Sequence, residues 1–148
     1  MTTTTSPGRV LESDEDIGAL LERTHRIAVL GIKIAETMQP AYYVPEYAQR
    51  SGYEIVPVPV YYPEVKEILG EAVYRKLVEV PGAIDMVNVF RRPKDLAMHL
   101  DDILAKRPRS AWLQLGIRDD TFASQLTAAG IDVVQDKCLL VELRRRGR

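Results

Sequence analysis

A short stretch near the N-terminus, residues 26–40 (RIAVLGIKIAETMQP), most constrains how this chain can fold. Four apolar residues run directly into Gly31, a partly polar segment follows, and Pro40 then begins an expected helix. A continuous apolar run between turn residues is typical of a strand buried on both faces, as in a parallel sheet. Glycine permits a sharp turn and a close approach of a ligand, and proline suits the first turn of a helix. The stretch therefore predicts a strand–loop–helix unit whose N–H groups and helix dipole face a bound anion such as phosphate.

The same alternation continues along the chain. We expect strands at 27–31, 53–58, 85–90, 110–115 and 131–134, and helices at 13–24, 40–50, 93–106, 119–129 and 137–146. Prolines between them predict a loop over the sheet edge, followed by a helical turn at 64–69 and a short helix at 71–79. Strands that alternate with helices form a parallel sheet covered on both faces. The fold class is therefore α/β, a Rossmann-like three-layer domain with a five-stranded, mainly parallel sheet.

Composition narrows the class of protein. The 148 residues are 46% hydrophobic and 28% charged, and we expect a disordered tail at 1–12 followed by a single domain at 13–148. The formal net charge of -1 gives no basic field for nucleic acid. No apolar run reaches the roughly 20 residues of a membrane-spanning helix. One cysteine excludes an internal disulfide, and a cytoplasmic location is expected.

Candidate ligand-binding residues follow the strands. The loop at 31–39 offers backbone N–H groups and Lys33, and Arg91 and Arg92 directly follow the strand at 85–90. Guanidinium groups in that position can bind a phosphate through two parallel hydrogen bonds. The alternatives are a solvated loop lysine and a solvated arginine pair offset by Asp95. Because parallel strands end at one edge of the sheet, these residues are expected to share one crevice.

Other reactive residue types form no recognisable catalytic or metal set. Tyrosines at 42–43 and 61–62 flank the expected crevice, where they could stack on an adenine, roof the sheet or fill a dimer interface. Cys138 is interpreted as a buried, inert thiol, with a reactive thiol as the alternative. His25 immediately precedes the strand at 27–31, and His99 is expected within a helix, far from the loop end of that strand. We assign no catalytic residue and no metal.

Six segments carry a resemblance to a known family: IAVLG, GYEIVPV, ILGEAVYRKLVEVP, DMVNVFRRP, AWLQLGI and VVQDKCLLVEL. In order and spacing they resemble the small stand-alone CoA-binding proteins, which are similar to the N-terminal CoA-binding domain of the succinyl-CoA synthetase alpha subunit. The resemblance covers about residues 15–145. It implies a Rossmann-like fold with coenzyme A bound across the strand ends.

The resemblance also implies roles for individual positions. The diphosphate loop is matched by Gly31, Ile32 and Lys33, the strand end near the adenosine by Pro57, Val58 and Pro59, the third-strand loop by Phe90, Arg91 and Arg92, and the turn beside the pantetheine arm by Gln114, Leu115 and Gly116.

The functional hypothesis is a module that binds CoA or acyl-CoA, with catalysis left open but not favoured, and with a homodimer or an unknown protein as possible further partners. A small NAD(P)-dependent enzyme is one alternative, although Lys33 and Glu36 replace two glycines of the dinucleotide fingerprint. An interaction protein with a degenerate crevice is another. It is favoured because the loops after the first two expected strands, IKIAETMQPAYYV and VPVYYPEV, depart from the sequences common in the family. A third is redox sensing, in which Cys138 forms a mixed disulfide with the CoA thiol.

Overall fold

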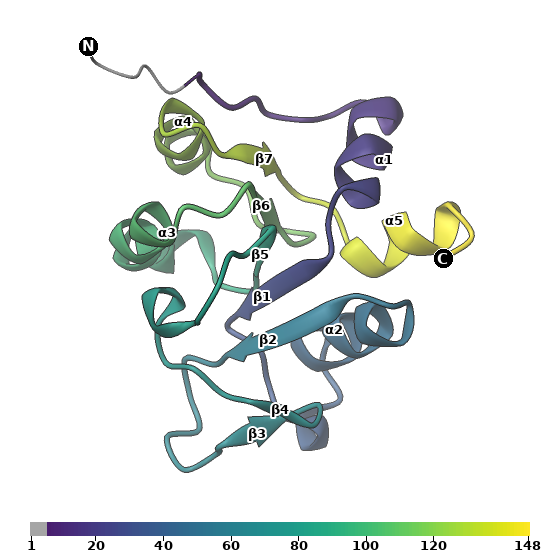
Figure 1. The fold of residues 1–148 in the computed structure, drawn as a ribbon, viewed down its shortest axis with the longest axis vertical. Helices are drawn as coiled ribbons and strands as arrows, with labels where there is room; N and C mark the ends of the chain where they lie inside the picture. Colours follow the sequence, from purple (N-terminus) through teal and green to yellow (C-terminus); the bar gives the residue numbers. More distant parts are fainter. Residues whose placement is uncertain (1–5) are drawn as a thin grey trace.

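A computed structural model describes residues 6–148 and shows a five-stranded parallel sheet with helices on both faces (Figure 1). The strand order is β2-β1-β5-β6-β7, with bounds Glu54–Val58, Arg26–Leu30, Met86–Val89, Ser110–Leu113 and Asp132–Val134. One face is covered by α1 (Asp14–Glu22), α2 (Pro40–Arg50) and α5 (Leu139–Arg145). The other is covered by α3 (Leu100–Lys106) and α4 (Asp120–Ala128). The predicted α/β fold with a five-stranded sheet is confirmed.

Local sequence signals explain where the helices begin. The Ser13 hydroxyl accepts a hydrogen bond from the Asp16 amide at 3.1 Å and caps α1, and the Asp119 carboxylate does the same for the Phe122 amide of α4 at 3.0 Å. Pro40 is the first residue of α2, as predicted. The strands read as apolar runs because both faces of the sheet are buried beneath helices.

The N-terminal segment differs from the prediction of a disordered tail at 1–12. Val10 pairs with Val133 of β7, and the Leu11 amide donates to the Val133 carbonyl at 2.8 Å. Leu11 is only 2% exposed, since it packs in the core beside α1 and α5. The prediction is therefore wrong for residues 8–12, which extend the sheet at its β7 edge; residues 1–5 lie outside the described part of the chain.

The segment after β2 also differs. In place of the predicted helical turn and short helix, residues 67–72 form a hairpin of β3 (Glu67–Ile68) and β4 (Glu71–Ala72), and a 3₁₀ turn covers Leu77–Glu79. The Arg75 guanidinium organises the loop by donating to the carbonyls of Tyr61, Tyr62 and Val65 at 2.7–3.0 Å. The hairpin packs beside β2, where the Tyr74 amide donates to the Pro57 carbonyl at 3.0 Å.

The predicted helix at 93–106 is shorter than expected. Two 3₁₀ turns, Pro93–Asp95 and Ala97–His99, precede α3, which begins at Leu100.

Within residues 6–148, no helix is both long and apolar enough to cross a membrane.

Candidate functional site

The candidate site lies where the order of the strands reverses. From β1 the chain goes to β2 on one side and later returns to β5 on the other, so the loops after β1 and β5 diverge at the carboxyl edge. Gly31 follows β1 with φ of 87°, and a Cβ there would lie 2.4 Å from the Phe90 carbonyl oxygen. A glycine is therefore required where these two loops touch.

The backbone amides expected to hold a phosphate already have partners inside the protein. The Gly31 amide donates to the Val58 carbonyl at 2.9 Å, and the Lys33 amide donates to the Ala41 carbonyl at 3.0 Å. At the end of β6, the Gly116 amide donates to the Asp136 carboxylate at 2.7 Å. The expectation that the Gly31 loop supplies free donors is thus wrong for the amides of Gly31 and Lys33. Side chains must therefore make more of the contacts to any bound anion.

A groove of about 300 Å³ runs past the ends of β1, β5 and β6. The structure brings seven of the predicted site residues to its wall: Lys33, Phe90, Arg91, Arg92, Gln114, Leu115 and Gly116. The Lys33 ammonium donates to the Gln39 side-chain carbonyl at 2.5 Å, so its charge is met by a neutral group. The Arg92 guanidinium is largely exposed and pairs with Asp95 at 3.0 Å.

Other predicted positions lie apart from this groove. Ile32 and Val58 are core residues, and Pro57 lies within β2 beside Val29. Pro59 lines a second, larger hollow.

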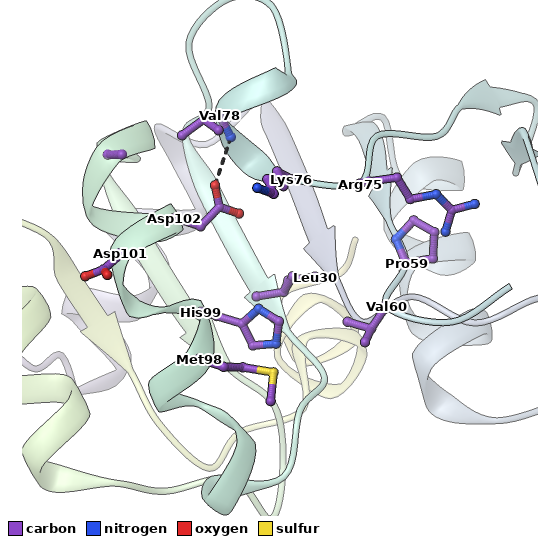
Figure 2. Close-up of a pocket in the computed structure, with 11 residues that line it drawn as sticks. Leu30, Pro59, Val60, Arg75, Lys76, Val78, Met98, His99, Asp101 and Asp102 are labelled. Carbon is purple, nitrogen blue, oxygen red and sulfur yellow. Dashed lines mark hydrogen bonds between the residues drawn. The ribbon is translucent and has the colours of Figure 1, made fainter. Parts of the chain in front are cut away.

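This larger pocket, of about 590 Å³, lies between α3 and the segments that follow β2 and β4 (Figure 2). Figure 2 shows His99 and Met98 reaching toward Leu30 and Val60 across a largely apolar space. At its far side, the Asp102 carboxylate accepts hydrogen bonds from the amides of Leu77 and Val78 at 2.8 and 3.1 Å. That carboxylate therefore caps the 3₁₀ turn rather than standing free.

Arg91 connects the two hollows. Its side chain lines the groove, while its guanidinium Nε donates to His99 Nε2 at 3.0 Å on the wall of the larger pocket. The guanidinium also lies 5.8 Å from the centre of the Tyr61 ring, and its Nη1 is 3.5 Å from the Tyr61 hydroxyl. Another nitrogen, Nη2, is 3.6 Å from Met98 Sδ. Its position makes Arg91 the side chain that a ligand spanning both hollows would meet.

The positive charge of Arg91 is incompletely neutralised. Arg91 is only 9% exposed, and within residues 6–148 the one carboxylate within 4.0 Å is that of Asp95, at 3.9 Å. Asp95 already pairs with Arg92 at the shorter distance of 3.0 Å. Burying a cation among neutral partners costs free energy, which an incoming anion would recover.

The same charge shifts its neighbours' proton equilibria. Burial, followed by the charge of Arg91, lowers the pKa of His99, in keeping with a neutral ring that accepts the Arg91 hydrogen bond. The hydrogen bond from Arg91, followed by its charge, lowers the pKa of the Tyr61 phenol.

Sequence reasoning missed His99 as a site residue. It lies eight positions after Arg91, and the intervening 3₁₀ turns bring the two side chains together. No spacing rule for a regular helix would have found the pair. Residues 6–148 hold no group of three or more His, Cys, Asp or Glu side chains placed to bind a metal.

Comparison with known proteins agrees with this geometry. A family model described as a CoA binding domain matches residues 25–144. The chain belongs to the CoA binding domain family. The match includes β1 through most of α5, and so both hollows described above.

Relatives of this CoA binding domain occur in bacteria and archaea. The uncharacterized protein YneT of Bacillus subtilis is 33% identical over 129 residues, which cover 87% of this chain and 93% of YneT. A structure from Thermus thermophilus is 40% identical with a TM-score of 0.82, covering 90% of this chain and 98% of that one. A hypothetical protein from Pyrococcus horikoshii is 27% identical with a TM-score of 0.81, covering 90% of this chain and 92% of that one.

Proposed function

We propose that this protein binds CoA or acyl-CoA across the carboxyl ends of β1, β5 and β6, and that it is a binding module without catalytic activity. The observation that carries the proposal is the buried, incompletely neutralised Arg91 between two hollows at the strand ends. Membership of the CoA binding domain family supports the identity of the anion.

The two hollows suit the two halves of the ligand. Apolar walls at Pro59, Val60 and Met98, with the His99 ring, would take the adenosine portion in the larger pocket. The groove beside Gln114 would take the thinner pantetheine arm. The diphosphate would then lie between them, against Arg91. The ligand would thus cross the point where the strand order reverses, as is general for open α/β sheets.

Lys33 and Arg92 would assist from the rim. The Lys33 ammonium has a neutral hydrogen-bond partner, and Arg92 is exposed enough to turn toward a phosphate. Both charges would speed the approach of the anion more than they tighten its binding, because exposed ion pairs contribute little free energy.

The absence of catalysis is proposed from what the polar groups are already doing. His99 uses Nε2 to accept from Arg91, and Asp102 caps a 3₁₀ turn. Neither arrangement is that of a general base beside a nucleophile.

An interaction protein is the second candidate. It is favoured by one observation, that the amides of Gly31, Lys33 and Gly116 are satisfied internally. A crevice that has given up its ligand would need such partners, because buried N–H groups without acceptors are costly.

Calorimetric titration with CoA tests the proposal, with NAD and ADP as comparison ligands. We expect micromolar CoA binding that Arg91→Met weakens about 10- to 100-fold, the value of a hydrogen bond to a charged group. Arg109→Met is the matched control, because Arg109 is an exposed arginine at the amino edge, 4.0 Å from Asp85. No binding at millimolar CoA would favour the interaction protein, and a preference for NAD would favour the nucleotide-dependent enzyme.

A further inference from the structure

A buried asparagine is hydrogen-bonded to Gln114, one of the residues that line the groove. Asn88 is central in β5 and 0% exposed, among otherwise apolar strand residues. Its side-chain Nδ2 donates to the Trp112 carbonyl at 3.3 Å and to Gln114 Oε1 at 3.4 Å. Its Oδ1 has no hydrogen-bond partner within residues 6–148. A buried polar group that is only half satisfied is costly in a core, so its retention calls for a physical reason.

Backbone groups fix the orientation of both side-chain amides. A carbonyl can only accept, so the Trp112 carbonyl requires the NH₂ group of Asn88 on its side. An amide N–H can only donate, so the Leu139 amide, 3.3 Å away, requires the oxygen of Gln114 on its side. Reversing either side chain would place like atoms against each other. The arrangement therefore has one consistent assignment.

This assignment decides which group of Gln114 is available to a ligand in the groove. Gln114 Oε1 is held by two interior donors, Asn88 Nδ2 and the Leu139 amide. No acceptor within residues 6–148 is bonded to Gln114 Nε2, and Gln114 lines the groove although it is only 4% exposed. The group left for a ligand is thus an NH₂ donor on a rigid, mostly buried side chain.

We propose that Gln114 Nε2 recognises a carbonyl oxygen of the ligand's amide-bearing arm, and that Asn88 is the positioning residue that keeps this donor turned outward. The inference rests on the proposed CoA function, because the pantetheine arm of CoA carries two amide carbonyls. A site built around a fixed donor rejects a ligand that lacks the acceptor, since the donor would lose its hydrogen bond to water without a replacement.

The decisive variant is Gln114→Glu. A carboxylate keeps an oxygen for Asn88 Nδ2 and the Leu139 amide, but it presents a second oxygen to the groove where the donor was. Gln135→Glu is the matched control, because Gln135 is also a buried glutamine just after a strand. Its side-chain oxygen accepts from the Asp119 backbone amide, and its side-chain NH₂ donates to the Asp120 carboxylate. The probes are CoA and adenosine 3′,5′-bisphosphate, which lacks the pantetheine arm.

We expect Gln114→Glu to weaken CoA binding roughly 10- to 100-fold while changing bisphosphate binding by less than about threefold. Gln135→Glu should change neither by more than about threefold. Unchanged CoA binding in Gln114→Glu, or an equal loss for both probes, would overturn the inference and leave the proposed function standing. Absence of CoA binding by the unsubstituted protein would overturn both.

NMR of the side-chain NH₂ groups tests the orientation without any ligand. In the free protein, the Gln114 NH₂ protons should exchange rapidly with water, and those of Asn88 should be protected. Asn88→Asp replaces one of the two donors on Gln114 Oε1 with a carboxylate acceptor, which competes with the Leu139 amide for the orientation of Gln114. A fraction of the Gln114 NH₂ groups should therefore turn inward and become protected, with a loss of CoA affinity. Protected Gln114 protons in the unsubstituted protein, or unchanged exchange in Asn88→Asp, would contradict the assigned positioning role.

Discussion

The two edges of the sheet are built differently, although the same five strands reach both. At the amino edge, the Asp85 carboxylate accepts from the amides of His25 and Arg26 at 3.0 and 2.8 Å. Two strands away at the same edge, the Asp132 carboxylate accepts from the Arg9 amide and pairs with Arg23, each at 2.9 Å. Each of these charges has close partners, so this edge holds separate segments of the chain together.

The carboxyl edge leaves hydrogen-bonding capacity and charge unused. In the described part of the chain, Arg91 is buried with its nearest carboxylate at 3.9 Å, and Asn88 has an oxygen without a partner. Met38 and Leu115 expose large apolar side chains at the same edge. Unmet polar groups beside exposed apolar ones reduce stability and are typical of ligand sites. The comparison teaches that polar groups at the amino edge are used up in holding the fold together, whereas those at the carboxyl edge are left available, as the proposed CoA site requires.

The largest expected effect is on a structural feature of the carboxyl edge, the close approach of Gly31 to Phe90. Gly31→Ala should lower the free energy of unfolding by about 3–5 kcal/mol, since the added Cβ meets the Phe90 carbonyl and the backbone φ is positive. Gly52→Ala is the control, because its φ is +106° but no atom of residues 6–148 would lie within 4 Å of the added Cβ. Its cost should be about 1–2 kcal/mol. Equal losses in urea unfolding would show that the contact between the β1 and β5 loops is not tight.

An amino-edge substitution should affect stability alone. Asp85→Ala removes a carboxylate that accepts two backbone hydrogen bonds, so we expect a loss of about 2–3 kcal/mol in the free energy of unfolding. CoA affinity, measured by titration well below the melting temperature, should stay within about twofold of the original. A large loss of affinity would break the division between the two edges.

Arg91→Met should show the reverse pattern. Removing a buried, incompletely paired cation and keeping an unbranched apolar side chain should change the free energy of unfolding by less than about 1 kcal/mol, in either direction. Binding would weaken, as described for the proposed function. If urea unfolding instead gave a loss as large as that for Asp85→Ala, Arg91 would be part of the framework and the comparison would fail.

The sequence predicted the elements whose signals are local. The α2 bounds follow from Pro40 at the start and Ser51-Gly52 at the end, and the Ser13 cap follows from its position before an acidic first turn. The β3–β4 hairpin was missed because its strands have two residues each and its loop depends on Arg75 contacts 10–14 positions away. Pairing of Val10 with Val133 is longer in range still.

The same limit applied to the site. That Arg91 follows a buried strand is visible in the sequence, and so is its place at the carboxyl edge. Its burial, its His99 partner and the remoteness of Asp95 depend on how the 3₁₀ turns fold back. The internal partners of the Gly31 and Lys33 amides come from β2 and α2, so no reading of the loop alone could have assigned them.

The smallest expected effect is a pH dependence of the free energy of unfolding that arises from His99, the hydrogen-bond partner of Arg91. The pKa of His99 is lowered by burial and by Arg91, with the carboxylates of Asp102 and Asp95 acting in the opposite direction. An unfolded chain therefore binds a proton at His99 with its ordinary pKa of 6.5, and near that pH the folded protein binds fewer protons at this ring. Because the unfolded state binds more protons, protonation of His99 favours unfolding. The stability that depends on a neutral His99 is fully present above pH 6.5 and is lost as the pH falls through the lower, folded-state pKa.

His99→Gln should remove this pH dependence, because an amide can accept from Arg91 without titrating. The measurement is urea unfolding of both proteins between about pH 5 and 8, where histidines titrate. Since His25 is present in both proteins, the difference between the two curves isolates His99. We expect the original protein to lose stability relative to His99→Gln as the pH falls below 6.5. Parallel curves would mean that the His99 ring accepts a proton in the folded state as readily as in water, and that Arg91 has room to move away from it. The carboxyl edge would then be looser than the hydrogen bond between them implies, and its unmet charge would be a property of one arrangement among several.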